Sequence, residues 1–137
     1  MLKISVVITA YNEEQYLSTC LQSVFSSDFP KDEFEVIVVN NNSKDTSAEI
    51  AKKFGARVLE EQKQGYVFAL SKGMNEALGE IIAVTDADTE VSKNWLNEIE
   101  KTFSVKDVVA TTGMSDLRTL NFSTKLVSGL GFYFFVK

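Results

Sequence analysis

The sequence contains no histidine, one cysteine and one proline among its 137 residues. Without histidine it can hold neither a Ser-His-Asp triad nor a histidine-ligated zinc site. The lone cysteine, Cys20, excludes an intramolecular disulfide, and its place on the apolar stripe of a predicted helix indicates a core residue. No window reaches the roughly 20 apolar residues of a membrane span, and the first residues lack signal-peptide architecture. We therefore expect a cytoplasmic location.

The composition is that of a soluble globular domain, with 45% hydrophobic and 24% charged residues. We expect residues 1–137 to form one domain. The net charge of −5 argues against nucleic acid as a partner. An anionic substrate would need a local cation or helix N-termini to bind beside so many acids.

Apolar runs and helical periodicities alternate along the chain, which predicts an α/β fold with an open, mostly parallel sheet and helices on both faces. The expected strands are Ile4–Thr9, Glu35–Val39, Arg57–Leu59, Ile81–Thr85 and Val108–Thr112. The expected helices are Glu13–Ser26, a helix ending near Phe54, Tyr66–Leu78 and Asn94–Phe103.

Polar residues and glycines predict where these helices begin and end. Asn12 is expected to cap the first helix, and Ser43 or Asp45 the second. Gly79 is expected to stop the third helix. Gly73 lies inside that helix, where glycine costs about 1 kcal/mol against alanine, and this indicates a close approach to the sheet or to a ligand.

Two aspartates, Asp86 and Asp88, follow the apolar strand 81–85 directly. Residues two apart on extended backbone point the same way, so their carboxylates repel each other unless a cation or proton lies between them. The carboxyl end of a parallel strand is where open α/β sheets bind ligands, and Mg²⁺ commonly joins one or two carboxylates to substrate phosphates. The alternative is that both are solvated loop acids.

Two further loops should meet the aspartates at the same edge of the sheet. The segment 9–13 offers the Tyr11 ring for stacking and backbone N–H groups at a helix start, and the segment 40–43 offers side-chain amides that could read a base. Base, ribose and diphosphate could be bound across this crevice. The alternatives are that Tyr11 packs at the sheet edge and that the asparagines serve only the turn.

These segments together resemble the glycosyltransferases of family 2, which have the GT-A fold. The resemblance covers about the first 115 residues, with the motifs in family order and spacing. It is carried by Ser5–Glu14, by Glu35–Asp45, by Gly65 with Ala69–Gly73, by Gly79–Asp88 with its D-x-D motif, and by Asn94–Leu96.

The resemblance implies transfer of a sugar from a UDP- or GDP-linked donor, assisted by Mn²⁺ or Mg²⁺ and with inversion. It places Asn41 against the base, Asp86 near the ribose or diphosphate, and Asp88 as the more direct metal ligand beside Asp86. The expected nucleotide-binding residues are Thr9, Ala10, Tyr11, Asn12, Glu13, Asn41, Gly65, Asp86 and Ala87.

The sequence also departs from the family. Asn40 and Asn41 replace the commoner aspartate pair, and Ser71 stands where the helix motif usually has asparagine. Family members normally continue into an acceptor-binding region that carries the catalytic base, so we expect the chain to be truncated before it. Asp116 is the one weak candidate for that base. The acceptor could be a glycan, a lipid or a small molecule, and the alternative function is a donor-binding module without turnover.

Four consecutive aromatic residues occupy positions 132–135. Exposed clusters of this kind mark partner or membrane surfaces. Self-association through this segment and peripheral membrane association of a longer form are therefore expectations.

Other enzyme classes fit the sequence less well. A haloacid-dehalogenase-type phosphatase would want Thr or Val where Glu90 stands, and its aspartates usually follow the first strand. A nucleotidyltransferase would need a Gly-rich, Arg-containing loop after the first strand. The dinucleotide-binding pattern G-x-G-x-x-G is absent.

Overall fold

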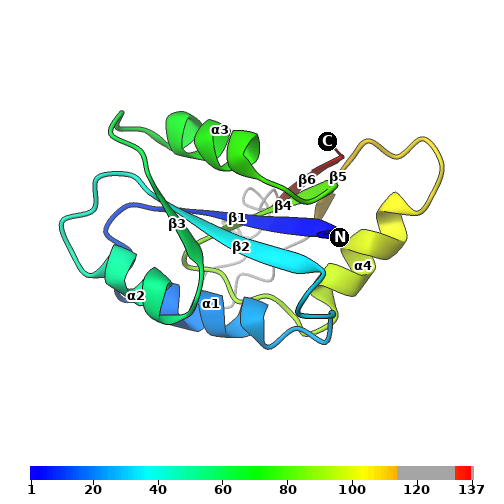
Figure 1. The fold of residues 1–137 in the computed structure, drawn as a ribbon, viewed down its shortest axis with the longest axis horizontal. Coiled ribbons are helices and arrows are strands. Elements are labelled where there is room, and N and C mark those ends of the chain that lie inside the picture. The colour runs from blue at the N-terminus through cyan, green and yellow to red at the C-terminus, as the bar shows by residue number, and fades with distance from the viewer. Residues whose placement is uncertain (114–131, 137) are drawn as a thin grey trace, which may run out of the picture.

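The computed structural model describes residues 1–113 and 132–136, which form one six-stranded sheet with four helices (Figure 1). The strands are β1 Ile4–Ala10, β2 Phe34–Asn40, β3 Arg57–Glu60, β4 Ile81–Asp86, β5 Ala110–Gly113 and β6 Phe132–Val136. The helices are α1 Leu17–Phe25, α2 Ser47–Lys53, α3 Tyr66–Glu76 and α4 Trp95–Phe103.

The sheet order is β3-β2-β1-β4-β6-β5. The first four strands in this order are parallel, and β6 runs antiparallel to both β4 and β5. The predicted open, mostly parallel sheet is confirmed. The expected fifth strand is present as β5, which pairs with β6 and not with β4.

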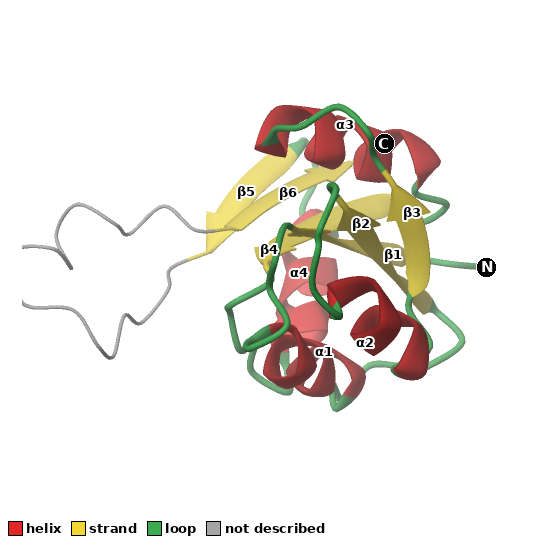
Figure 2. Ribbon diagram, turned by 90° about the vertical axis from the view of Figure 1, so that its left-hand side faces the viewer, coloured by secondary structure: helices red, strands yellow, loops and turns green. Residues whose placement is uncertain are grey.

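Helices cover both faces of the sheet, with α1, α2 and α4 on one side and α3 on the other (Figure 2). Neighbouring residues of a strand point to opposite faces, so each central strand supplies both cores. In β1, Val6 and Ile8 pack in the core beneath α1, whereas Val7 packs in the core beneath α3. Cys20 belongs to the first of these cores at 1% exposure, as predicted.

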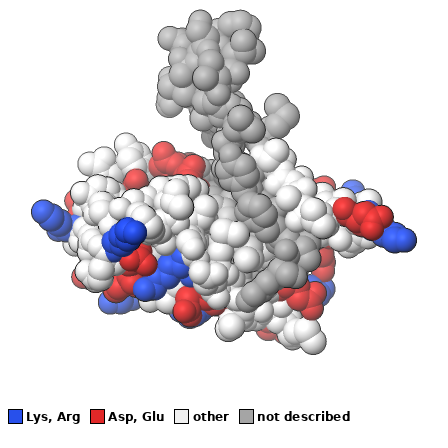
Figure 3. All heavy atoms as spheres, turned by 90° about the horizontal axis from the view of Figure 1, so that it is seen from above, with Lys and Arg blue, Asp and Glu red and all other residues white. Residues whose placement is uncertain are grey.

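The face seen from above mixes acidic and basic side chains with wide uncharged areas (Figure 3). No continuous basic area is visible among the described residues of that face. Within the described ranges 1–113 and 132–136, no helix is long and apolar enough to cross a membrane.

Gly73 lets α3 lie directly on the sheet. A Cβ atom at this position would be 2.4 Å from Cγ1 of Val7 and 3.0 Å from Cγ2 of Val39. Real Cβ atoms do not approach other carbons so closely, so any side chain here would push the helix outward. The predicted close approach is confirmed, and it is an approach to the sheet.

The predicted start of the first helix is wrong. α1 begins at Leu17, and its N-cap is Tyr16 without a side-chain cap. Asn12 has a positive φ of 58° and accepts a hydrogen bond from the backbone N–H of Lys44 at 2.8 Å. Its side chain therefore joins two loops and caps no helix.

Two other helix ends also differ from the expectation. The N-cap of α2 is Thr46. Asp45, one residue before this N-cap, accepts a hydrogen bond from the backbone N–H of Ser47 at 3.0 Å. α3 ends at Glu76, before Gly79. Gly79 instead passes against β1, since a Cβ there would lie 2.6 Å from the backbone of Ile4.

The aromatic segment Phe132–Phe135 lies within β6, whose backbone pairs with a strand on each side. Its expected role in self-association stays a prediction. Asp116, the candidate base, lies outside the described residues.

Candidate functional site

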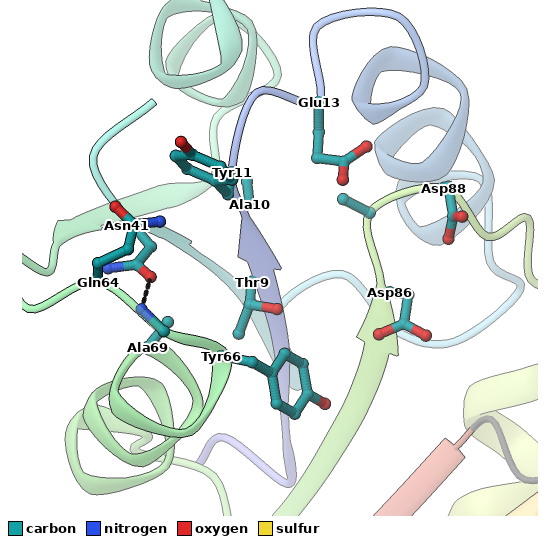
Figure 4. A pocket seen from close by; sticks show the side chains of 12 residues that line it. Thr9, Ala10, Tyr11, Glu13, Asn41, Gln64, Tyr66, Ala69, Asp86 and Asp88 are labelled. Atoms are coloured by element: carbon teal, nitrogen blue, oxygen red, sulfur yellow. Dashed lines mark hydrogen bonds between the residues drawn. The ribbon is translucent and has the colours of Figure 1, made fainter. Parts of the chain in front are cut away.

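A pocket of about 350 Å³ opens at the carboxyl ends of β1, β2 and β4, beside the start of α3 (Figure 4). The parallel strands point their ends toward this one edge, so loops far apart in sequence meet there. Its lining residues are Thr9, Ala10, Tyr11, Glu13, Asn41, Gln64, Gly65, Tyr66, Ala69, Asp86, Ala87 and Asp88.

The structure brings together every predicted nucleotide-binding and metal-binding residue except Asn12. Asn12 faces the loop before α2, where its backbone N–H donates to Oγ of Ser43 at 3.0 Å. Three lining residues were not predicted from the sequence: Gln64, Tyr66 and Ala69. The start of α3 was the available signal for them, because a helix N-terminus at this sheet edge faces the crevice.

Asp86 and Asp88 stand on a tight turn that ends β4. The backbone N–H of Thr89 donates to the carbonyl of Asp86 at 3.2 Å, and the Cys20 thiol contacts the same carbonyl at 3.5 Å. Burial raises the pKa of the Cys20 thiol to about 12, so it remains protonated and can donate. The contact with Cys20 thus attaches this turn to the hydrophobic core beneath α1.

The electrostatics of this turn favour a bound cation. Partial burial, and then the charge of Asp88, raise the pKa of the Asp86 carboxyl above its ordinary value. A divalent cation with oxygen ligands would relieve both penalties. The donor set therefore fits Mg²⁺ or Mn²⁺. Among the described residues, no three acidic or cysteine side chains are grouped closely enough to hold a metal by themselves.

Glu13 adds a third carboxylate on the same side of the pocket as Asp86 and Asp88 (Figure 4). Its backbone N–H donates to Oγ of Ser47 at 2.9 Å, which fixes the loop after β1. Burial, followed by the charges of Asp88, Asp45 and Asp86, raises the pKa of the Glu13 carboxyl. The pocket mouth is consequently acidic, and a polyphosphate would be repelled there without a cation.

Tyr11 is 50% exposed although it lines the pocket. A ring that only packed at the sheet edge would be more fully covered. The exposure therefore favours a stacking surface, although the contact with a base stays a prediction.

Asn41 is only 3% exposed, and its amide is bonded within the protein. Nδ2 donates to the carbonyls of Glu61 and Lys63, each at 2.8 Å, and Oδ1 accepts from the backbone N–H of Gly65 at 2.7 Å. The last of these bonds is the dashed line in Figure 4. Both donors are engaged, so one lone pair of Oδ1 is what remains for a ligand.

The family model described as glycosyl transferase family 2 matches residues 5–126. The chain belongs to this family. The predicted family resemblance and the GT-A fold are thereby confirmed.

Curated relatives in the family include the glycosyltransferase AglE of Haloferax volcanii, 35% identical over 107 residues. The match covers 74% of this chain and 35% of AglE. The poly(ribitol-phosphate) beta-N-acetylglucosaminyltransferase TarS of Staphylococcus aureus is 33% identical over 104 residues, which are 72% of this chain and 18% of TarS.

Solved structures of two glycosyltransferases have a similar fold. A structure of S. aureus TarS in complex with UDP matches with a TM-score of 0.80 at 26% identity, over 88% of this chain and 38% of that chain. The mannosyltransferase PcManGT of Pyrobaculum calidifontis, in complex with GDP-Man and Mn²⁺, matches with a TM-score of 0.82 over 98% of this chain and 44% of that chain. At 23% identity, the second likeness is one of fold.

Proposed function

We propose that this chain binds a nucleotide-sugar donor, UDP- or GDP-linked, in the pocket at the carboxyl ends of β1, β2 and β4, and that it supplies the donor site of a glycosyltransferase. The observation that carries the proposal is the geometry of the pocket. A half-exposed tyrosine and an amide oxygen lie on one side, and two carboxylates on a fixed turn lie on the other.

The pocket offers suitable groups for the base and for the diphosphate of a nucleoside diphosphate. The Tyr11 ring offers a stacking face for the base, and Oδ1 of Asn41 offers an acceptor. The acceptor suits a base edge that carries an N–H, as the edges of uracil and guanine do. Asp86 and Asp88 would hold Mn²⁺ or Mg²⁺, which neutralises the charge of a departing diphosphate when bound.

The comparisons support this proposal at the level of the family. TarS is solved with UDP and with UDP-GlcNAc, and PcManGT with GDP-Man and Mn²⁺. The chain spans 18–35% of the length of the two curated relatives described above. Transfer to a glycan, lipid or small-molecule acceptor, and a cytoplasmic location, are accordingly part of the proposal. A donor-binding module without turnover is the second candidate.

Calorimetry with purified protein tests the proposal directly. UDP or GDP should bind with Mn²⁺ or Mg²⁺ present and much more weakly with a chelator. Asp88→Ala should remove the metal dependence. Glu90→Ala is the matched control, because Glu90 is an exposed acid on the same loop that does not line the pocket.

The possible results separate the parts of the proposal. Equal affinity for UDP with metal and with chelator would refute the metal role. Absence of binding for every nucleotide would refute the donor site. Release of sugar from a bound nucleotide-sugar, with and without acceptors, would separate a transferase from a binding module.

A further inference from the structure

Three consecutive asparagines after β2 bond to the connection between β3 and α3. Nδ2 of Asn40 donates to Oε2 of Glu60 at 2.8 Å, and Nδ2 of Asn42 donates to the carbonyl of Gln62 at 2.6 Å. Between them, Asn41 makes the three bonds described above, to Glu61, Lys63 and Gly65. Side-chain amides thus join the two loops where the strand pairing ends.

Backbone pairing alone does not hold this connection. The pairing of β2 with β3 ends at Asn40 and Glu60, and the backbone N–H of Glu61 makes one further bond, to the carbonyl of Asn40 at 2.9 Å. Beyond that point, the contacts across to the β2 loop come from Asn41 and Asn42. The base-side wall of the pocket is therefore built by side chains.

Asn41 also controls where α3 begins. Gly65 has a φ of 135°, which L side chains rarely adopt, and its N–H is held by Oδ1 of Asn41. The carbonyl of Gly65 in turn accepts from the backbone N–H groups of Phe68 and Ala69, at 3.1 Å and 3.2 Å. The bonded glycine thus anchors the first turn of the helix, where Tyr66 and Ala69 line the pocket.

An amide suits this position and a carboxylate does not. Two carbonyl acceptors lie on one side of the Asn41 side chain and one N–H donor on the other, so only one orientation of the amide satisfies all three. An aspartate would place an oxygen against the carbonyls of Glu61 and Lys63 and would leave both without a donor. Buried groups without partners are costly.

We propose that Asn41 is a positioning residue of the nucleotide pocket, whose amide holds the Glu61–Gly65 segment and the start of α3 against the base side. This proposal rests on the proposed donor site, and it assigns the amide nitrogen to the protein and not to the ligand. Asn41 can then contact a base directly only by accepting a hydrogen bond at the remaining lone pair of Oδ1.

Nitrogen-15 NMR on the full wild-type chain tests this assignment without any mutation. The two Nδ2 protons of Asn41 and the amide proton of Gly65 should exchange slowly in the free protein. They should stay protected when UDP or GDP binds with Mg²⁺. Loss of protection of the Nδ2 protons on binding would mean that the amide turns to the base, which overturns the proposal.

The variant Asn41→Asp adds a pH-dependent readout. At about pH 8 it should bind UDP about tenfold more weakly than wild type, because the ionised acid repels the two carbonyls. At about pH 5.5 the loss should be clearly smaller, because a protonated carboxyl regains one of the two donors of the amide. Asn75→Asp, the same change on the exposed face of α3, is the control and should match wild type at both pH values.

A pH-independent loss, or a loss no larger than that of Asn75→Asp, would overturn the positioning role. If wild-type protein binds no nucleotide, the donor site fails, and the exchange rates of the free protein then decide separately whether Asn41 holds the segment.

Discussion

Replacing Gly73 by alanine tests whether α3, which lines the pocket, packs directly on the sheet. The added Cβ would meet Cγ1 of Val7 at 2.4 Å and Cγ2 of Val39 at 3.0 Å. Both valines are fully buried in the core beneath α3, so neither can turn away into solvent. The helix itself has to move outward.

Two opposing terms set the magnitude. Alanine is the better helix former by about 1 kcal/mol, which would stabilise an exposed helix. Overpacking a tight contact costs about 1–3 kcal/mol. We therefore expect the free energy of unfolding to fall by up to about 2 kcal/mol, a loss of several degrees in Tm for a domain of this size.

Urea unfolding followed by circular dichroism measures this change. Asn75→Ala, on the exposed face of the same helix, is the matched control and should raise stability by roughly 0.5 kcal/mol. UDP affinity should also fall in Gly73→Ala, because the displaced helix carries Tyr66 and Ala69 away from the pocket. A Gly73→Ala protein as stable as the control would refute the close contact.

Three further outcomes are expected. Tyr11→Ala should weaken UDP binding by about 1–2 kcal/mol in calorimetry with little change in Tm, because the ring is half exposed; a large loss of Tm with intact affinity would make it a packing residue. Because the pKa of Asp86 is raised, the metal-free protein should lose stability as the pH rises from the carboxyl's ordinary value of 3.8 through the raised one. Asp86→Asn should flatten that slope in urea titrations, and an unchanged slope would contradict the assignment. The acids that line the pocket are Glu13, Asp86 and Asp88, all at its metal side, and general-base assistance is worth about 10²–10⁴-fold. The 137-residue chain should therefore transfer sugar slowly in a radiolabel assay, and efficient transfer would direct the search for the base to Asp116.

The sequence predicted the four parallel strands because each is a short apolar run, and buried parallel strands are apolar on both faces. It predicted most of the pocket because the ends of such strands converge at one edge. The sequence did not predict the start of α1, because the loop before α1 is held by residues that are distant in the sequence. The backbone N–H of Glu14, for example, donates to Oδ2 of Asp45 at 3.0 Å. The local sequence Asn12-Glu13-Glu14 is typical of a helix cap followed by an acidic first turn. It does not reveal contacts with residues that are distant in the sequence.

The role of the asparagines was missed for the same reason. Asn41 is a typical turn residue in its own neighbourhood, and only the fold brings Lys63 and Gly65 to its amide. The position of β6 was equally hidden. The aromatic segment was not predicted to be a strand, and nothing local indicates that it enters the sheet between β4 and β5.

That insertion has a consequence for how the protein is made. β4 carries the aspartates and is synthesised well before β6, which pairs with Ile81, Ile82 and Ala83. Until β6 arrives, one edge of β4 presents unpaired backbone groups, and an apolar open edge is a template for association with other chains. Ribosome-bound or prematurely terminated chains should thus be the aggregation-prone species, and a chaperone would be expected to engage the strand that later bears the donor site.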